Sequence, residues 1–116
     1  MLNYQSRPID GVFRALADPT RRAIVESLSG SPASVSDLAA QLPMSLPGVH
    51  QHLQVLAAAG LITWEKQGRV RWCRLEARRL REIEEWVLAR RLMWQRRLDA
   101  LAVHLEQGKR KGGKRR

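Results

Sequence analysis

Residues 45–60 read SLPGVHQHLQVLAAAG, and this stretch decides the fold. It begins with Ser45, whose side chain can cap a helix, and it ends with Gly60, which can stop one. Pro47 falls in the first turn, where the missing N–H costs nothing. The sequence therefore predicts one helix over residues 45–59.

The predicted helix has a narrow apolar face and a polar face without formal charge. Val49, Leu53 and Leu56 fall within about 60° of one another at roughly 100° per residue, and they form the apolar face. Short and amide side chains can donate and accept hydrogen bonds at base edges in a DNA major groove. An ordinary amphipathic helix is equally compatible with this segment alone. The opposite, polar side carries Pro47, His50, Gln51, Gln54 and Ala58.

The chain is strongly basic. Its 116 residues include 21 Lys and Arg against 11 Asp and Glu, which gives a net charge of +10. Six of the basic residues lie in the last eight positions. The length suits one domain, and a basic body with a still more basic tail predicts a polyanionic partner, either nucleic acid or an anionic membrane.

Cysteine usage and hydropathy bear on the compartment. The single cysteine, Cys73, excludes an intrachain disulfide and suits a reducing cytoplasm. The first eight residues contain no apolar segment of the kind that a signal peptide has. Residues 38–64 carry no charge, but two prolines and two histidines within them exclude a membrane span. We therefore expect a soluble cytoplasmic protein with no membrane partner.

Short helices are predicted ahead of this stretch. Apolar side chains recur every three or four residues over 8–16, and Asp18-Pro19 can cap and start a second helix over residues 19–29. The run Ser34-Val35-Ser36-Asp37 matches a capping box that opens a third helix. With the helix over 45–59, this third helix makes a predicted helix-turn-helix.

After Gly60 the sequence pattern changes from one typical of a helix to one typical of β-strands. Residues 61–66 and 70–75 favour β-strands, and the connection Gln67-Gly68-Arg69 contains the glycine typical of a hairpin. A basic hairpin directly after a helix-turn-helix is the winged-helix plan, in which the second helix enters the major groove and the wing reaches phosphates or the minor groove. The basic side chains of the predicted wing, residues 61–75, are Lys66, Arg69, Arg71 and Arg74.

Residues 76–106 contain no proline or glycine and predict one long helix. Its apolar stripe is wider than one small domain can cover, so it indicates a dimer interface. We expect residues 1–106 to form one DNA-binding and dimerisation domain, beginning with a mobile arm over 1–7, and residues 107–116 to be a disordered basic tail. The fold class is thus mainly α, a winged helix-turn-helix with a β-hairpin wing and a long C-terminal dimerisation helix. The candidate interface residues are Ile83, Trp86, Val87, Trp94, Leu98, Leu101 and Leu105.

Two segments resemble a known family. The run VFRALADPTRRAI over residues 12–24 resembles the opening of ArsR-type (ArsR/SmtB-like) winged-helix repressors. The run MSLPGVHQHLQVL over residues 44–56, followed by Ala59-Gly60-Leu61-Ile62, is similar to the recognition helix and wing entry of that family. The resemblance implies a homodimeric repressor of a pseudo-palindromic operator, often its own promoter, that binds double-stranded DNA through the fourth helix and the wing.

Two departures separate this chain from the metal-sensing members. Those members carry Cys-x-Cys in the third helix, where residues 35–40 here have no thiol. Others place Asp/His pairs along the last helix, where this chain offers Asp99 and His104 without a second histidine. The resemblance is therefore to the metal-independent branch, with no metal site or cofactor and an unknown inducer. Position 54 is Gln where relatives frequently have Lys, which leaves the base preference open.

The candidate DNA contacts combine the polar face of the helix with the wing. Gly48 would let the helix N-terminus approach a phosphate, and Gln51 or Gln54 could pair with adenine. Further phosphate candidates are Arg14, Arg21, Arg22 and Arg74, although a solvated surface charge is about as common a role for any one arginine. The full candidate set is Ser45, Leu46, Pro47, Gly48, His50, Gln51, Gln54, Lys66, Arg69 and Arg71.

Other reactive side chains have simpler interpretations. His50 and His52 point about 200° apart on a helix and cannot chelate one ion, so His50 is assigned to DNA and His52 to structure. Cys73 is either a buried apolar residue or a redox switch activated by a nearby arginine. Trp86 and Trp94 could line a ligand pocket, although interface packing is the commoner role.

The sequence contains no catalytic constellation, so we expect no enzyme activity. Two alternatives to a repressor remain open. One is a winged-helix module for protein interaction, and the other is an architectural DNA binder without sequence preference.

Overall fold

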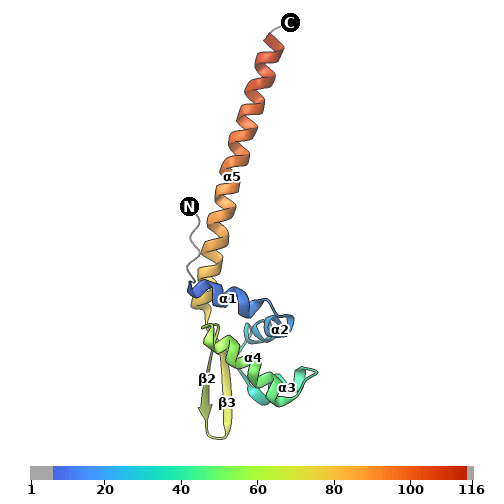
Figure 1. Ribbon diagram of the computed structural model, residues 1–116, viewed down its shortest axis with the longest axis vertical. Coiled ribbons are helices and arrows are strands. Elements are labelled where there is room, and N and C mark those ends of the chain that lie inside the picture. The colour runs from blue at the N-terminus through green and yellow to red at the C-terminus, as the bar shows by residue number, and fades with distance from the viewer. Residues whose placement is uncertain (1–6, 115–116) are drawn as a thin grey trace. The chain divides into compact units, whose positions relative to one another are not determined.

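The structure, a computed structural model, describes residues 7–114 (Figure 1). The chain divides into two compact units, Met1–Glu82 and Ile83–Arg116. Residues 1–6 of the expected arm and the last two residues of the expected tail lie outside the described residues. The elements in chain order are α1 (Pro8–Leu16), α2 (Pro19–Leu28), β1 (Ala33–Ser34), α3 (Val35–Gln41), α4 (Leu46–Ala58), β2 (Ile62–Gln67), β3 (Val70–Leu75) and α5 (Ala77–Lys114).

The predicted helix caps form as the sequence indicates. The Asp18 carboxylate accepts the N–H of Arg21 at 2.9 Å and starts α2. The Ser34 hydroxyl accepts the N–H of Asp37 at 3.0 Å and starts α3. Each cap satisfies a donor that has no partner inside its helix, which is why the first helical residues match the prediction.

The core of the first unit lies where the helices α1 to α4 meet the sheet. The predicted apolar face of α4 is fully buried in it. Apolar side chains buried from α1 to α4, β2 and β3 make the winged helix one cooperative structure. Side chains that are at most 1% exposed belong to Val12, Ala15, Ile24, Leu38, Val49, Leu53, Leu56, Leu61, Ile62 and Cys73.

The sheet has three antiparallel strands in the order β1-β3-β2. The sequence predicts β2 and β3 but not β1, in which Ala33 pairs with Cys73 and Ser34 with Trp72. Two residues are too few to show a period, so no alternation marks this strand. Its pairing with β3 joins the start of α3 to the wing.

The turn of the wing is tighter than the predicted three-residue connection. Gln67 pairs with Val70, so that only Gly68 and Arg69 form the loop. Gly68 has a φ of +64°, whereas no residue other than glycine has a positive φ in the described chain. A glycine with positive φ at the first of two loop positions is typical of a type II′ turn, which matches the twist of the flanking strands.

The end of α4 is fixed by a Schellman motif. The N–H of Gly60 donates to the carbonyl of Ala57 at 3.0 Å, and the N–H of Leu61 donates to the carbonyl of Leu56 at 3.0 Å. Gly60 adopts a φ of +77°, which this motif requires and which L-residues rarely adopt. The carbonyl of Leu61 then accepts the N–H of Glu76 at 2.8 Å, which ties the end of α4 to the start of α5.

The helix α5 is longer than the sequence indicates. It runs for 38 residues to Lys114, past the expected end near Glu106 and through most of the segment expected to be disordered. Lys109 and Arg110 near this end favour the continuation, because cations complement the negative end of the helix dipole. Within residues 7–114, no helix has the length and apolar content to cross a membrane.

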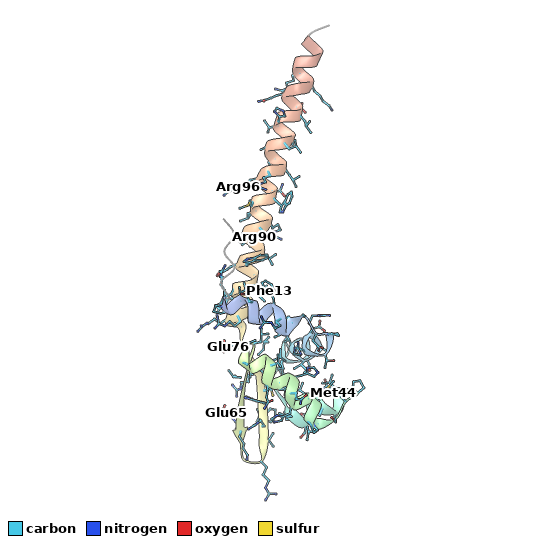
Figure 2. All side chains as sticks on the ribbon, in the orientation of Figure 1. Phe13, Met44, Glu65, Glu76, Arg90 and Arg96 are labelled. Atoms are coloured by element: carbon cyan, nitrogen blue, oxygen red, sulfur yellow. The ribbon has the colours of Figure 1, made fainter. Side chains whose placement is uncertain are left out.

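The second unit is a helical segment whose apolar side chains are exposed (Figure 2). Trp94 is 62% exposed and Leu98 is 53% exposed, and these are two of the candidate interface residues. Exposed apolar side chains so numerous on one helix indicate an interaction surface. The dimer itself stays a prediction.

We predict that Gly60→Ala destabilises the first unit by more than the conformational cost of a left-handed alanine, which is about 1–2 kcal/mol. An added Cβ would lie 3.0 Å from Nε and 3.1 Å from Cγ of Arg79, so that side chain must also move. Urea unfolding at 25 °C measures the loss. Gly68→Ala is the matched control, because it has a positive φ but meets no atom within 4 Å. Equal losses in the two variants would show that Arg79 yields without cost.

Candidate nucleic-acid interface

The helix α4 presents the polar face that the sequence predicts. Gln51 and Gln54 are exposed, and within the described residues neither amide makes a hydrogen bond. Leu46, in the first turn, is 54% exposed, and Ser45 and Pro47 are exposed beside it. The helix α4 therefore offers two free amides and one apolar side chain to a ligand.

The N-terminus of α4 has fewer free N–H groups than the sequence interpretation assumes. The Ser45 hydroxyl accepts the N–H of Gly48 at 3.3 Å, and Pro47 has no N–H to offer. A Cβ on Gly48 would lie 3.4 Å from the Ser45 hydroxyl, which is ordinary contact. Gly48 is thus not required by a close packing contact, and its N–H is already bonded within the chain.

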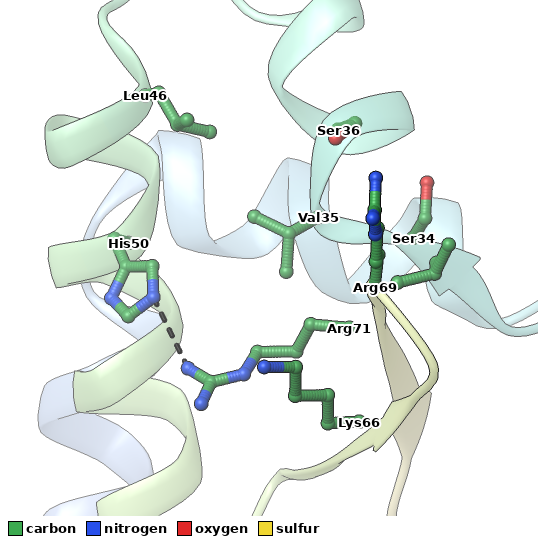
Figure 3. A pocket seen from close by; sticks show the side chains of 9 residues that line it. Ser34, Val35, Ser36, Leu46, His50, Lys66, Arg69 and Arg71 are labelled. Carbon is green, nitrogen blue, oxygen red and sulfur yellow. Dashed lines mark hydrogen bonds between the residues drawn. The ribbon is translucent and has the colours of Figure 1, made fainter.

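His50 lies in a three-residue cluster and not freely on the outer face. Its Nε2 lies 3.2 Å from Nη1 of Arg71 (Figure 3). The Arg71 guanidinium also lies over the Trp64 ring, with 4.7 Å between its Cζ and the ring centroid. The rings of His50 and Trp64 are 5.0 Å apart and tilted by 44°. The cluster joins α4 to both strands of the wing.

The register of the hairpin decides which cations face α4. Lys66 and Arg71 are direct partners across β2 and β3, in phase with the pair Ile62 and Leu75 further along, of which Ile62 is buried. Because side chains alternate along a strand, these cations share the core-facing side of the wing, whereas Arg74 lies on the other side. The sequence alone shows that the hairpin is basic, but not which of its cations face α4.

A groove of about 380 Å³ separates the wing from α4 and the start of α3 (Figure 3). Its apolar floor includes Val35 and Leu46, and three cations line the wing side, namely Lys66, Arg69 and Arg71. Within the described residues, the single ion pair is Arg79 with Glu82, so no carboxylate neutralises these cations. Like charges directly opposite one another destabilise a hairpin, and an anion in the groove would relieve that repulsion.

Two of the arginines that the sequence suggests as phosphate contacts, Arg21 and Arg22, donate hydrogen bonds to backbone carbonyls of the same chain. The Arg21 Nε donates to the carbonyl of Ala15 at 2.6 Å and its Nη2 to that of Arg14 at 3.3 Å. The Arg22 Nη1 donates to the carbonyl of Leu16 at 2.8 Å. These carbonyls lie in the last turn of α1, where the helix leaves carbonyls short of N–H partners; that of Arg14 also accepts the N–H of Ala17 at 3.2 Å. Arg21 and Arg22 thus cap α1.

The remaining candidates have structural surroundings. The Nη1 of Arg21 lies 3.4 Å from Nδ1 of His52, in agreement with the structural role predicted for that histidine. The N–H of Arg21 holds the pKa of Asp18 below its usual value. Burial raises the pKa of the Cys73 thiol and outweighs the opposite effect of Arg71, which favours the inert interpretation of this cysteine. The described residues contain no cluster of three or more His, Cys, Asp or Glu side chains that could hold a metal ion.

Comparison with known proteins identifies the family. A family model described as a helix-turn-helix domain matches residues 16–63. The transcriptional repressor SdpR of Bacillus subtilis is 31% identical over 80 residues, which are 69% of this chain and 89% of that repressor. The crystal structure of the ArsR family transcriptional regulator RHA00566 has a TM-score of 0.74 at 41% identity, over 82% of this chain and 97% of that one. The chain belongs to the ArsR family.

The family assignment confirms the predicted winged helix and the helix-turn-helix DNA-binding domain of a transcriptional regulator. The transcriptional regulator Rv2034 of Mycobacterium tuberculosis is 52% identical over 62 residues, 53% of this chain. The chain matches 56% of the length of that relative.

Sequence reasoning missed one member of the interface of this ArsR-family protein. Trp64 is half-buried and contacts both His50 and Arg71, but it reads as an ordinary apolar strand residue in the sequence. Its period-two relation to Ile62 and Lys66 is the only available signal, because that relation places it on the inner face of the wing.

We predict that Arg21→Ala lowers the free energy of unfolding of the regulator by about 1–2 kcal/mol, because the part-buried carbonyl of Ala15 loses its side-chain donor, and that it leaves DNA affinity nearly unchanged. Urea unfolding and a DNA titration on the same preparations measure both effects. Arg14→Ala is the control, since that exposed guanidinium makes no hydrogen bond in the described part of the chain. Lost DNA affinity at wild-type stability would instead identify Arg21 as a phosphate contact.

Proposed function

We propose that this ArsR-family regulator is a homodimeric repressor that binds a pseudo-palindromic operator, its own promoter included. The observation that carries the proposal is the placement of an uncharged amide face on α4 beside a groove with three unneutralised cations. Amides read base edges and cations bind phosphates, so these two surfaces supply the two kinds of contact that specific DNA binding needs.

The base-reading part of the proposal assigns α4 to the major groove. Gln51 or Gln54 pairs with adenine through its free amide, which accepts and donates at once. The exposed Leu46 and the Ser45 hydroxyl lie at the leading end of the helix, where an apolar side chain fits a thymine methyl group. These contacts discriminate among sequences.

The phosphate part of the proposal assigns the wing to the DNA backbone. Lys66 and Arg71 face the groove, and Arg69 occupies the turn at its edge. Contacts to phosphate fix the register of the protein on the duplex without reading its sequence. They also release counterions, so that affinity falls with added salt.

The dimer part of the proposal rests on the second unit. Val87, Trp94 and Leu101 recur every seven residues, and Leu98 and Leu105 each follow one of them by four. This heptad pattern is typical of helices that pair along an apolar seam, with Arg91 as one polar interruption at the seam. A second copy of α5 would cover the exposed side chains and present two reading helices to half-sites about 34 Å apart.

We predict that Gln51→Ala lowers discrimination between operator and random duplex, because one bidentate base contact is worth about 1–3 kcal/mol. Arg69→Ala weakens binding to both duplexes alike and reduces the salt slope by about 1, since it removes one phosphate contact. Fluorescence anisotropy titrations against a selected operator and a scrambled duplex measure both variants. Identical losses on the two duplexes for both variants would contradict the assignment, and failure of the wild type to prefer any sequence would indicate an architectural binder.

We predict that Leu98→Glu shifts the protein from dimer to monomer at micromolar concentration, because a carboxylate at the seam is desolvated without a partner. Analytical ultracentrifugation measures the change. Ala100→Glu is a matched control, since it adds the same charge two residues further on, outside the apolar stripe. Dissociation by both variants would show a charge effect on the whole helix, and a wild type that is monomeric even with operator DNA would overturn the dimer.

A further inference from the structure

The Arg71 guanidinium contacts two aromatic rings. Its Nη1 lies 3.2 Å from Nε2 of His50, and its Cζ lies 4.7 Å from the centroid of the Trp64 ring. The two rings are themselves in contact at 5.0 Å. Fixing the side chain of an exposed arginine in one such position costs conformational entropy.

The position is also unfavourable by charge. Lys66 lies directly across the hairpin from Arg71, and Arg69 lines the same groove. No carboxylate in the described residues pairs with any of the three. The stacking of a guanidinium on an indole ring opposes this repulsion, because the ring face carries negative charge density. The rings therefore allow three cations to remain together without a counterion from the protein.

We propose that Trp64 and His50 hold Arg71 in place, so that Lys66, Arg69 and Arg71 form a preorganised site for one phosphodiester group of the DNA backbone. The proposal rests on the proposed function and deepens it. Trp64 is a positioning residue, since it acts on the phosphate through Arg71. His50 becomes a positioning residue too, because its Nε2 is engaged with Arg71 and not directed at a base.

Preorganisation gives this site its advantage. A guanidinium that already has its bound orientation loses less freedom when a phosphate arrives, which improves binding without any added contact. The same contacts join α4 to β2 and β3, so the reading helix and the phosphate-binding wing dock as one surface. Loss of Trp64 should therefore weaken DNA binding although no charge is removed.

A double-mutant cycle tests the proposal on the full chain. Trp64→Leu, Arg71→Ala and the double variant are titrated with a selected operator duplex by fluorescence anisotropy at several salt concentrations. We expect Arg71→Ala to lower affinity about tenfold and to reduce the salt slope by about 1. We expect Trp64→Leu to lower affinity about fivefold, and the double variant to be no weaker than Arg71→Ala alone, since coupled residues are not additive.

Arg74→Ala provides the matched control for this cycle. It removes the same charge from the same strand but from the face of the wing turned away from α4. The losses of affinity caused by Trp64→Leu and Arg74→Ala should therefore multiply to within about twofold, as expected of sites that share no contact. Trp64→Phe keeps an aromatic face and should restore most of the affinity and the full salt slope.

The outcomes separate the inference from the function on which it rests. Additive effects of Trp64→Leu and Arg71→Ala, with wild-type DNA binding intact, would overturn the inference alone. Absence of DNA binding by the wild type would overturn the proposed function. If Trp64→Leu does not fold, the cycle is made with His50→Phe, which keeps a ring against Trp64 but removes the nitrogen that contacts Arg71. Additivity in that cycle would equally overturn the inference.

Discussion

The fold depends on the burial of one narrow face of α4. Val49, Leu53 and Leu56 are completely buried, whereas Gln51 and Gln54 are exposed. Because three side chains on one face fix the rotation of a helix about its axis, the exposure of Gln51 and Gln54 follows from that burial. The orientation of Gln51 and Gln54 therefore follows from the core contacts of α4 and requires no hydrogen bond of their own.

Charge on the wing opposes stability and serves binding. The cross-strand pair of Lys66 and Arg71 places two cations where an opposite pair would stabilise the hairpin. The buried side chains of Ile62 and Cys73, nearer the other end of the strands, supply apolar contacts that keep the hairpin folded. Apolar contacts thus stabilise the base of the wing. Near its tip the cations have no carboxylate partner in the described residues, so a polyanion can bind there.

The sequence predicts whatever depends on local rules. The caps at Asp18, Ser34 and Ser45 and the apolar face of α4 involve residues three or four apart, and a reader can find them without a structure. The contacts that escape prediction join distant residues. His52 meets Arg21 across 31 positions, and His50 meets Arg71 across 21. Periodicity places such residues on a face but does not say which side chain from another element will meet them.

The division of labour between α4 and the wing follows from the chemistry at the start of α4. A helix N-terminus commonly binds a phosphate through free N–H groups. Here Pro47 has none, and the N–H of Gly48 is taken by the Ser45 cap. The same cap that defines where α4 begins thus reduces its capacity to bind a phosphate through the backbone. Phosphate contacts near this end therefore fall mainly to side chains, and the unneutralised cations of the adjacent groove are the ones that the fold places there.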